Sequence, residues 1–166
     1  MAPKTAHKYT TEFTTPSDRE LVAVRFVDAP RTLVWDVHTK PEHVRKWMLG
    51  PDGWSMPVCE IDLRPGGRWR YVYRKDDGSE QFELGGEFRE IVPPERLVHT
   101  EAWGGDFAEA LDTLVLTEKD GRTTITTTIL FPDKEARDRA MGTGMTEGWA
   151  QSYDKLDEVL PTLMGR

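Results

Sequence analysis

Two ionisable side chains, those of His99 and Glu101, lie two residues apart in the run RLVHTEAW. Side chains two positions apart share one face of a strand, so both groups face the core if Leu97 and Trp103 do. A buried imidazole beside a buried carboxylate can exchange protons near neutral pH, because each group perturbs the pKa of the other. Three interpretations stay open: an acid/base pair, a polar handle for a ligand, or structural pairing with each other or with Arg and Tyr side chains across the sheet.

The strands that would position this pair are indicated by apolar residues that recur at every second position. One such run is residues 68–75, where large rings alternate with arginines, and a second is residues 81–91. Paired glycines, Gly85 and Gly86, lie inside the second run and predict a bulge or a sharp bend. The apolar face of the two runs consists of Trp69, Tyr71, Tyr73, Phe82, Leu84 and Phe88.

The last thirty or so residues change to the spacing of an amphipathic helix. Gly142 and Gly144 each cost a helix about 1 kcal/mol relative to alanine, so we expect a short helix from Asp133, a break, and then a long helix. Pro161 predicts that the regular helix stops near Leu160, because the proline ring clashes with the carbonyl four residues earlier. The apolar stripe consists of Met141, Met145, Trp149, Tyr153, Leu156, Leu160 and Leu163.

The amino-terminal half predicts one strand followed by two short helices. The strand covers residues 21–27, and a helix over residues 30–38 begins at a proline, which suits a first helical turn. Thr39 and Glu42 have the spacing of a capping box for a second helix that ends near Met48. Further strands are expected at residues 56–63, 68–75, 81–91, 96–103, 111–118 and 123–131. Hairpin-linked strands with helices on one side predict an α+β domain with an antiparallel sheet.

Length and composition restrict the function classes. A chain of 166 residues suits one domain, so we expect an arm over residues 1–18, partly disordered, and a single domain over residues 19–166. The net charge of −7 argues against nucleic acid and against docking on anionic lipid. The single Cys59 cannot form an internal disulfide, and no apolar run of about 18 residues or leader sequence is evident. The cytosol is therefore the expected compartment.

Metal and nucleophile chemistry are not expected. The four histidines, His7, His38, His43 and His99, lack the spacing of a His-Glu-x-x-His zinc motif, and Cys59 has no partner for a zinc cluster. Cys59 is not flanked by the signature of a cysteine hydrolase. We predict no metal and no cofactor.

Six tryptophans in so short a chain are more than a core needs, and aromatic-lined gaps bind small apolar ligands. The alternative is that the aromatic and methionine stripes are ordinary core. Gly148 and Ser152, on the long helix, favour a cavity because small side chains leave space. The candidate ligand-binding residues are Trp69, Tyr71, Phe82, Leu84, Phe88, His99, Glu101, Trp103, Met141, Met145, Trp149 and Tyr153.

Four segments carry a resemblance to a known family: DAPRTLVWDVHTKPEHVRKW, CEIDLRPGGRWRYVY, FREIVPPERLVHTE and FPDKEARDRAMGTGMTEGWAQSYDKLDEVL. They are similar to bacterial proteins that share the carboxyl-terminal domain of the activator of heat shock protein 90 ATPase, within the START-like (SRPBCC, polyketide cyclase-like) superfamily. The resemblance implies a helix-grip fold. In that fold a curved antiparallel sheet of six to seven strands wraps around a long carboxyl-terminal helix, with two short helices after the first strand and a cavity between sheet and helix.

The resemblance implies no fixed reaction, because the superfamily includes carriers of hydrophobic ligands as well as cyclases. We expect a protein that binds a small apolar or aromatic molecule. One alternative is a cyclase- or dehydratase-like enzyme that uses His99 and Glu101, which stand where relatives usually carry aromatic residues. A second is a chaperone-associated interaction module. Residues 1–20 are too short for the chaperone-binding domain of the eukaryotic activator, so chaperone activation is not expected. A homodimer through a free strand edge or the arm stays open.

Overall fold

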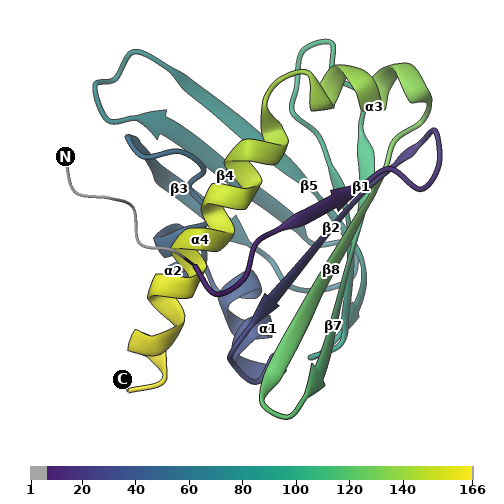
Figure 1. The fold of residues 1–166 in the computed structure, drawn as a ribbon. Coiled ribbons are helices and arrows are strands. Elements are labelled where there is room, and N and C mark those ends of the chain that lie inside the picture. Colours follow the sequence, from purple (N-terminus) through teal and green to yellow (C-terminus); the bar gives the residue numbers. More distant parts are fainter. Residues whose placement is uncertain (1–6, 166) are drawn as a thin grey trace.

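The alternating segments form one antiparallel sheet in the computed structural model, which describes residues 7–165 (Figure 1). The described residues contribute eight strands in the order β1-β2-β8-β7-β6-β5-β4-β3. The strands are β1 Glu12–Thr14, β2 Glu20–Val27, β3 Trp54–Ile61, β4 Arg68–Lys75, β5 Gln81–Val92, β6 Arg96–Glu101, β7 Ala110–Lys119 and β8 Arg122–Leu130. The sheet exceeds the six or seven strands expected because β1, within the segment predicted as an arm, pairs with β2. Residues 1–6 of that segment lie outside the described residues.

Four helices are described, and the long one crosses the inner face of the sheet (Figure 1). The helices are α1 Arg31–Thr39, α2 Pro41–Trp47, α3 Lys134–Met141 and α4 Met145–Leu163. Helices α1 and α2 follow β2, and α2 packs against α4. The predicted α+β helix-grip arrangement, with two short helices after the first long strand, is confirmed.

A buried arginine holds α4 on the sheet. Arg25, on β2, is fully buried, and its guanidinium pairs with Asp154 at 3.0 Å and with Asp157, both on α4. Burial raises the pKa of the Asp157 carboxyl even though the Arg25 charge opposes that shift. A buried cation with two carboxylate partners fixes the angle at which the helix crosses the strands.

Gly86 of β5 allows β6 to approach closely. A Cβ on Gly86 would lie 1.9 Å from the carbonyl oxygen of Thr100, on β6, so no side chain fits there. The same carbonyl accepts a hydrogen bond from Trp69 Nε1 at 3.1 Å, and the Thr100 hydroxyl accepts one from the backbone N–H of Glu87 at 2.9 Å. Strands β4, β5 and β6 are therefore locked together next to His99.

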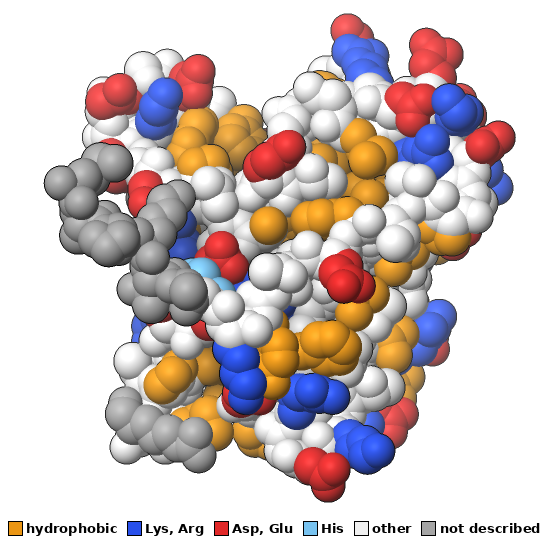
Figure 2. Space-filling view, in the orientation of Figure 1, with side chains coloured by type: hydrophobic (Ala, Val, Ile, Leu, Met, Phe, Trp, Pro, Cys, Tyr) orange, Lys and Arg blue, Asp and Glu red, His pale blue; other side chains and the backbone are white. Residues whose placement is uncertain are grey.

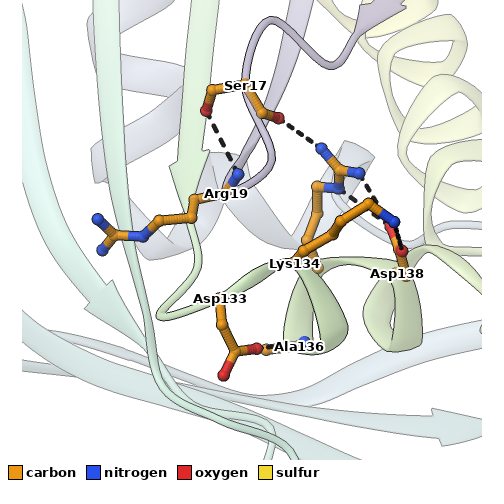
Figure 3. Close-up of polar contacts among 7 residues, drawn as sticks. Ser17, Arg19, Asp133, Lys134, Ala136 and Asp138 are labelled. Atoms are coloured by element: carbon orange, nitrogen blue, oxygen red, sulfur yellow. Dashed lines mark hydrogen bonds and ion pairs between the residues drawn. The ribbon is translucent and has the colours of Figure 1, made fainter.

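Helix α3 begins where the sequence predicts a helix start. The Asp133 carboxylate accepts a hydrogen bond from the backbone N–H of Ala136 at 2.7 Å, which caps the helix (Figure 3). Arg137, on the same helix, is buried and donates to the carbonyl of Ser17, in the segment before β2. This contact ties α3 to the segment that precedes β2.

Two helix-end predictions are wrong. Thr39 does not cap α2: its hydroxyl donates to the Trp35 carbonyl at 2.8 Å, and the cap position is Lys40, because Pro41 occupies the first helical position. Helix α4 continues past Pro161 to Leu163. The proline removes one hydrogen bond close to the helix end, and the next turn still closes, because the Met164 N–H donates to the Leu160 carbonyl at 3.1 Å.

Candidate functional site

A cavity of about 580 Å³ lies between the inner face of the sheet and the amino-terminal half of α4. Its volume falls within the range of roughly 300 to 1,000 Å³ that small-molecule sites occupy. Figure 2 shows hydrophobic side chains gathered in a hollow beside α4. The hollow lies between two raised parts of the molecule, one that carries the β4–β5 turn and one that carries α3. The sheet and α4 therefore enclose space that side chains do not fill.

All but one of the candidate ligand-binding residues line this cavity. Those that do are Trp69, Tyr71, Phe82, Leu84, Phe88, His99, Glu101, Trp103, Met145, Trp149 and Tyr153. Met141 does not: it is the last residue of α3 and packs in a second apolar cluster with Leu21 and Ile129. The break between α3 and α4 explains the difference, because Met141 and Met145 lie on separate helices.

Several residues that line the cavity were not predicted from the sequence. The loop after α2 contributes Gly50 and Pro51, and the β6–β7 loop contributes Phe107. Asp112 on β7 also lines the cavity, although aspartate in a strand ordinarily predicts an outward position. The alternation of Ala110, Asp112 and Leu114 is the signal that could have placed it inside.

His99, Glu101 and Asp112 form a polar cluster on the cavity wall. His99 and Asp112 are directly opposite each other on paired strands, and His99 Nε2 lies 3.9 Å from Asp112 Oδ2. That distance is too long for a hydrogen bond. Glu101 Oε2 accepts a hydrogen bond from Trp103 Nε1 at 2.9 Å. Both side chains line the cavity, so His99 and Glu101 lie on the inner face of the sheet.

Burial sets the charges of this cluster. It lowers the pKa of His99, and the Nδ1 atom lies 3.1 Å from the Thr100 carbonyl, which favours the tautomer with the proton on Nδ1. Burial and the charge of Glu101, with a hydrogen bond between the two carboxyls, raise the pKa of Asp112 well above its ordinary value. Burial therefore favours the uncharged forms of the His99 imidazole and the Asp112 carboxyl.

Two tyrosines on β4 complete the polar part of the lining. Burial raises the pKa of both Tyr71 and Tyr73, and the negative charge of Glu101 acts in the same direction. Neither hydroxyl hydrogen-bonds to another residue in the described part of the chain. The Tyr73 ring stacks on Phe82 at 4.9 Å between centroids, and Phe82 is exposed at the rim.

Gly148 and Ser152 line the cavity and also contact the loop after α2. The Ser152 hydroxyl accepts a hydrogen bond from the Gly50 N–H at 2.8 Å, and a Cβ on Gly148 would lie 3.7 Å from Pro51 Cδ. Lys155 Nζ donates to the Gly50 carbonyl at 2.8 Å. The small residues let the loop after α2 lie against α4, where it closes one wall of the cavity.

Groups outside the cavity show little reactive character. Burial raises the pKa of the Cys59 thiol to about 11, so the thiolate is scarce near neutral pH. Among residues 7–165, His7, Asp154 and Asp157 are close enough together to hold a metal ion. The guanidinium of Arg25 already binds both of these carboxylates. None of the described helices is long and apolar enough to cross a membrane.

Comparison with known families finds one match that covers most of the chain. The family model described as Activator of Hsp90 ATPase homolog 1-like protein matches residues 28–161. This span runs from the end of β2 into the last turn of α4 and includes every strand that lines the cavity. Comparison with curated proteins found no match.

Solved structures show the same fold. A crystal structure of a Rhodobacter sphaeroides protein is 27% identical, with a TM-score of 0.84, and the alignment covers 92% of this chain and 99% of that one. A Nitrosomonas europaea protein is 26% identical, with a TM-score of 0.80 and coverage of 92% and 100%. An AHSA1-like protein of Aeromonas hydrophila, 19% identical with a TM-score of 0.62 and coverage of 80% and 92%, shares the fold alone.

Proposed function

The chain belongs to the family of Activator of Hsp90 ATPase homolog 1-like proteins, and from that premise we propose that it binds a small, mostly apolar molecule in the cavity under α4, without covalent chemistry. The observation that carries this proposal is an unfilled space of about 580 Å³ walled by aromatic and aliphatic side chains. A void of that size inside a domain costs dispersion contacts and persists where a ligand fills it.

The lining supports an apolar ligand with one polar end. Most of the wall consists of aromatic and aliphatic side chains, whereas its two carboxyl groups and the His99 imidazole gather at one place, with Glu101 and Asp112. Ligand sites commonly combine a broad apolar wall with a few placed polar groups that fix the orientation of the ligand. Met48 and Met145 add flexible thioethers, which adapt to ligands of different shape.

Exposed lining residues indicate where a ligand would enter the cavity. Phe82 is 48% exposed and packs against Trp54 at 5.3 Å between ring centroids, and both line the cavity. Thr143 and Gly144, between α3 and α4, are exposed on the opposite side. A ligand would enter between these two sides.

A second candidate function is acid/base catalysis in the same cavity, of the cyclase or dehydratase kind. Asp112 adds a proton donor to the His99 and Glu101 pair, and the Nε2 lone pair of His99 faces Asp112 at 3.9 Å. A neutral base beside a protonated acid is the arrangement that proton transfer requires. Turnover of a bound ligand that stops in a His99→Gln variant would distinguish catalysis from binding.

The exposed hydrophobic residues give little support to a chaperone-associated role. The large hydrophobic residues exposed in the described chain are Leu63, Phe82 and Val92. Phe82 and Val92 lie at opposite ends of the long strand β5, so the three form no continuous patch of the kind that marks a protein interface. A cytosolic location and a homodimer through the free edge of β1 or β3 stay predictions.

Native mass spectrometry of the purified protein tests the proposal, because the mass difference reports the ligand class and stoichiometry. We expect a bound molecule in the unmodified protein. Leu84→Trp, on the cavity face of β5, should lower the bound fraction, whereas Glu83→Trp, on the outer face, should not. Equal occupancy in both variants, or no binding of any added apolar probe, would contradict a ligand site under α4.

A further inference from the structure

The ionisable groups that face the cavity are neutral or negative. The lining formed by the described residues contains no lysine or arginine, and its charged types are Glu101 and Asp112. The two histidines of the lining add no positive charge near neutral pH, because burial lowers the pKa of His99 and brings the pKa of His38 to about 4. The carboxylate of Glu101 therefore faces the cavity without a cation from the lining.

Three cations lie close to lining residues but do not themselves line the cavity. Arg25 is paired with two carboxylates behind Tyr153, and Lys155 donates to the Gly50 carbonyl and to Asp52 at 2.9 Å. Arg139 lies over the Phe107 ring, 4.8 Å from its centroid, and donates to the Asp106 carbonyl. None of these contacts brings a positive side chain to Glu101.

Aromatic rings surround the same carboxylate. Trp103 donates its indole N–H to Glu101, and the charge of Glu101 is felt by the hydroxyls of Tyr71 and Tyr73. Trp69 lies next to Tyr71, with 4.7 Å between ring centroids. Ring faces carry negative electrostatic potential and attract cations, most strongly in tryptophan and where water is excluded.

We propose that this cavity selects apolar amines, with the ammonium group at the Glu101 carboxylate and the hydrocarbon part among the rings, over carboxylic acids of the same shape. The inference rests on the proposed binding function and names its ligand class. An ammonium group donates charge-assisted hydrogen bonds to Glu101 and takes cation–π stabilisation from the surrounding rings. A carboxylate at the same place would meet a like charge in a site of low dielectric constant.

The amino terminus of α4 brings partial positive charge to the cavity, and a carboxylate lies beside it. The amino terminus of α4 reaches the cavity at Gly144 and Met145, and the unpaired N–H groups of a helix start favour anions. Glu147 lies in that first turn and offsets this partial charge. The start of α4 therefore adds little uncompensated positive charge to the cavity.

Calorimetric titration with three matched probes tests the inference at pH 7: naphthylmethylamine, naphthylmethanol and naphthoic acid. The three share one ring system and differ in a terminal group that is cationic, neutral or anionic at this pH. We expect the amine to bind at least about tenfold more tightly than the alcohol, as expected for a charge-assisted hydrogen bond, and the acid to bind most weakly.

Two variants assign the effect to one carboxylate. Glu101→Gln keeps an oxygen for the Trp103 N–H and should remove most of the amine preference, with little change for the alcohol. Glu83→Gln removes an equal charge from the outer face of the sheet and should leave all three affinities unchanged.

The outcomes separate this inference from the binding function. Alcohol or acid binding as tightly as the amine in the unmodified protein would overturn the amine preference and leave an apolar site intact. Amine binding that Glu101→Gln leaves unchanged would also overturn it. Failure of all three probes to bind would refute the binding function together with the inference.

Discussion

Gly86→Ala is expected to destabilise the protein strongly, because the methyl group has no space. Its Cβ would lie 1.9 Å from the carbonyl oxygen and 2.6 Å from the carbonyl carbon of Thr100. Carbon atoms in ordinary contact are about 3.5 to 4.0 Å apart, so β5 and β6 would have to separate by more than about 1 Å. A backbone carbonyl in a sheet cannot rotate out of the way as a side chain can.

The magnitude follows from the bonds at this crossing. Separation of the strands breaks the Trp69 Nε1 bond to the Thr100 carbonyl and the Glu87 N–H bond to the Thr100 hydroxyl, each worth about 1 kcal/mol. Overpacking adds about 1 to 3 kcal/mol. The free energy of unfolding should fall by about 3 to 5 kcal/mol, and the melting temperature by about 10 °C for a chain of this size.

Urea unfolding followed by tryptophan fluorescence measures this loss, and Gly85→Ala is the matched control. A Cβ on Gly85 would meet the Trp69 carbonyl oxygen at 3.1 Å, which a small shift relieves, so we expect a loss of about 1 kcal/mol. The Gly86 variant should also bind naphthylmethanol less tightly, because β6 carries the polar cluster. Equal urea midpoints for the two variants would show that β5 and β6 accommodate a methyl group at Gly86 without separating.

Three further predictions concern buried charges. Arg25→Met leaves Asp154 and the half-buried Asp157 without their cation, so urea titration should show a loss of about 2 to 3 kcal/mol. The pKa of His38 is about 4 in the folded state and ordinarily 6.5, so protonation of this ring favours the unfolded chain. The His38 contribution to the free energy of unfolding, fully present above pH 6.5, should therefore fall by about 3 kcal/mol as the pH drops to 4. NMR titration should show the ring neutral above about pH 5. Asp112 has a raised pKa, so its own contribution to stability should decrease as the pH rises above 4, opposite in sign to that of His38, and in urea titrations between pH 4 and 8 Asp112→Asn should gain stability relative to the unmodified protein as the pH rises.

The sheet was predictable because its pattern is local. Residues 68–75 alternate rings and charges at every second position, and β4 has those bounds in the structure. His99 and Glu101 reach the cavity for the same reason, since period two places both on the face of Leu97. A pairing register of one-sided strands follows from such alternation, because a slip of one residue would expose every buried side chain.

The features that the sequence did not reveal depend on contacts between distant segments. Local alternation indicates the face of Asp112, but it does not show that β7 pairs with β6 so that Asp112 lies opposite His99. The loop at Gly50 lies against Ser152 on α4, more than a hundred residues away. Pro161 stays helical because the backbone hydrogen bond from Met164 to Leu160 closes the turn that contains it. The residue type alone does not reveal that bond.

NMR with isotope-filtered nuclear Overhauser effects between naphthylmethanol and the labelled protein would locate a ligand in the cavity under α4. We expect cross-peaks from the naphthyl protons to the rings of Trp69, Tyr71 and Trp149, which face the cavity from the sheet and from α4. Cross-peaks confined to rings outside the cavity, such as Phe26, would contradict a binding site between the sheet and α4.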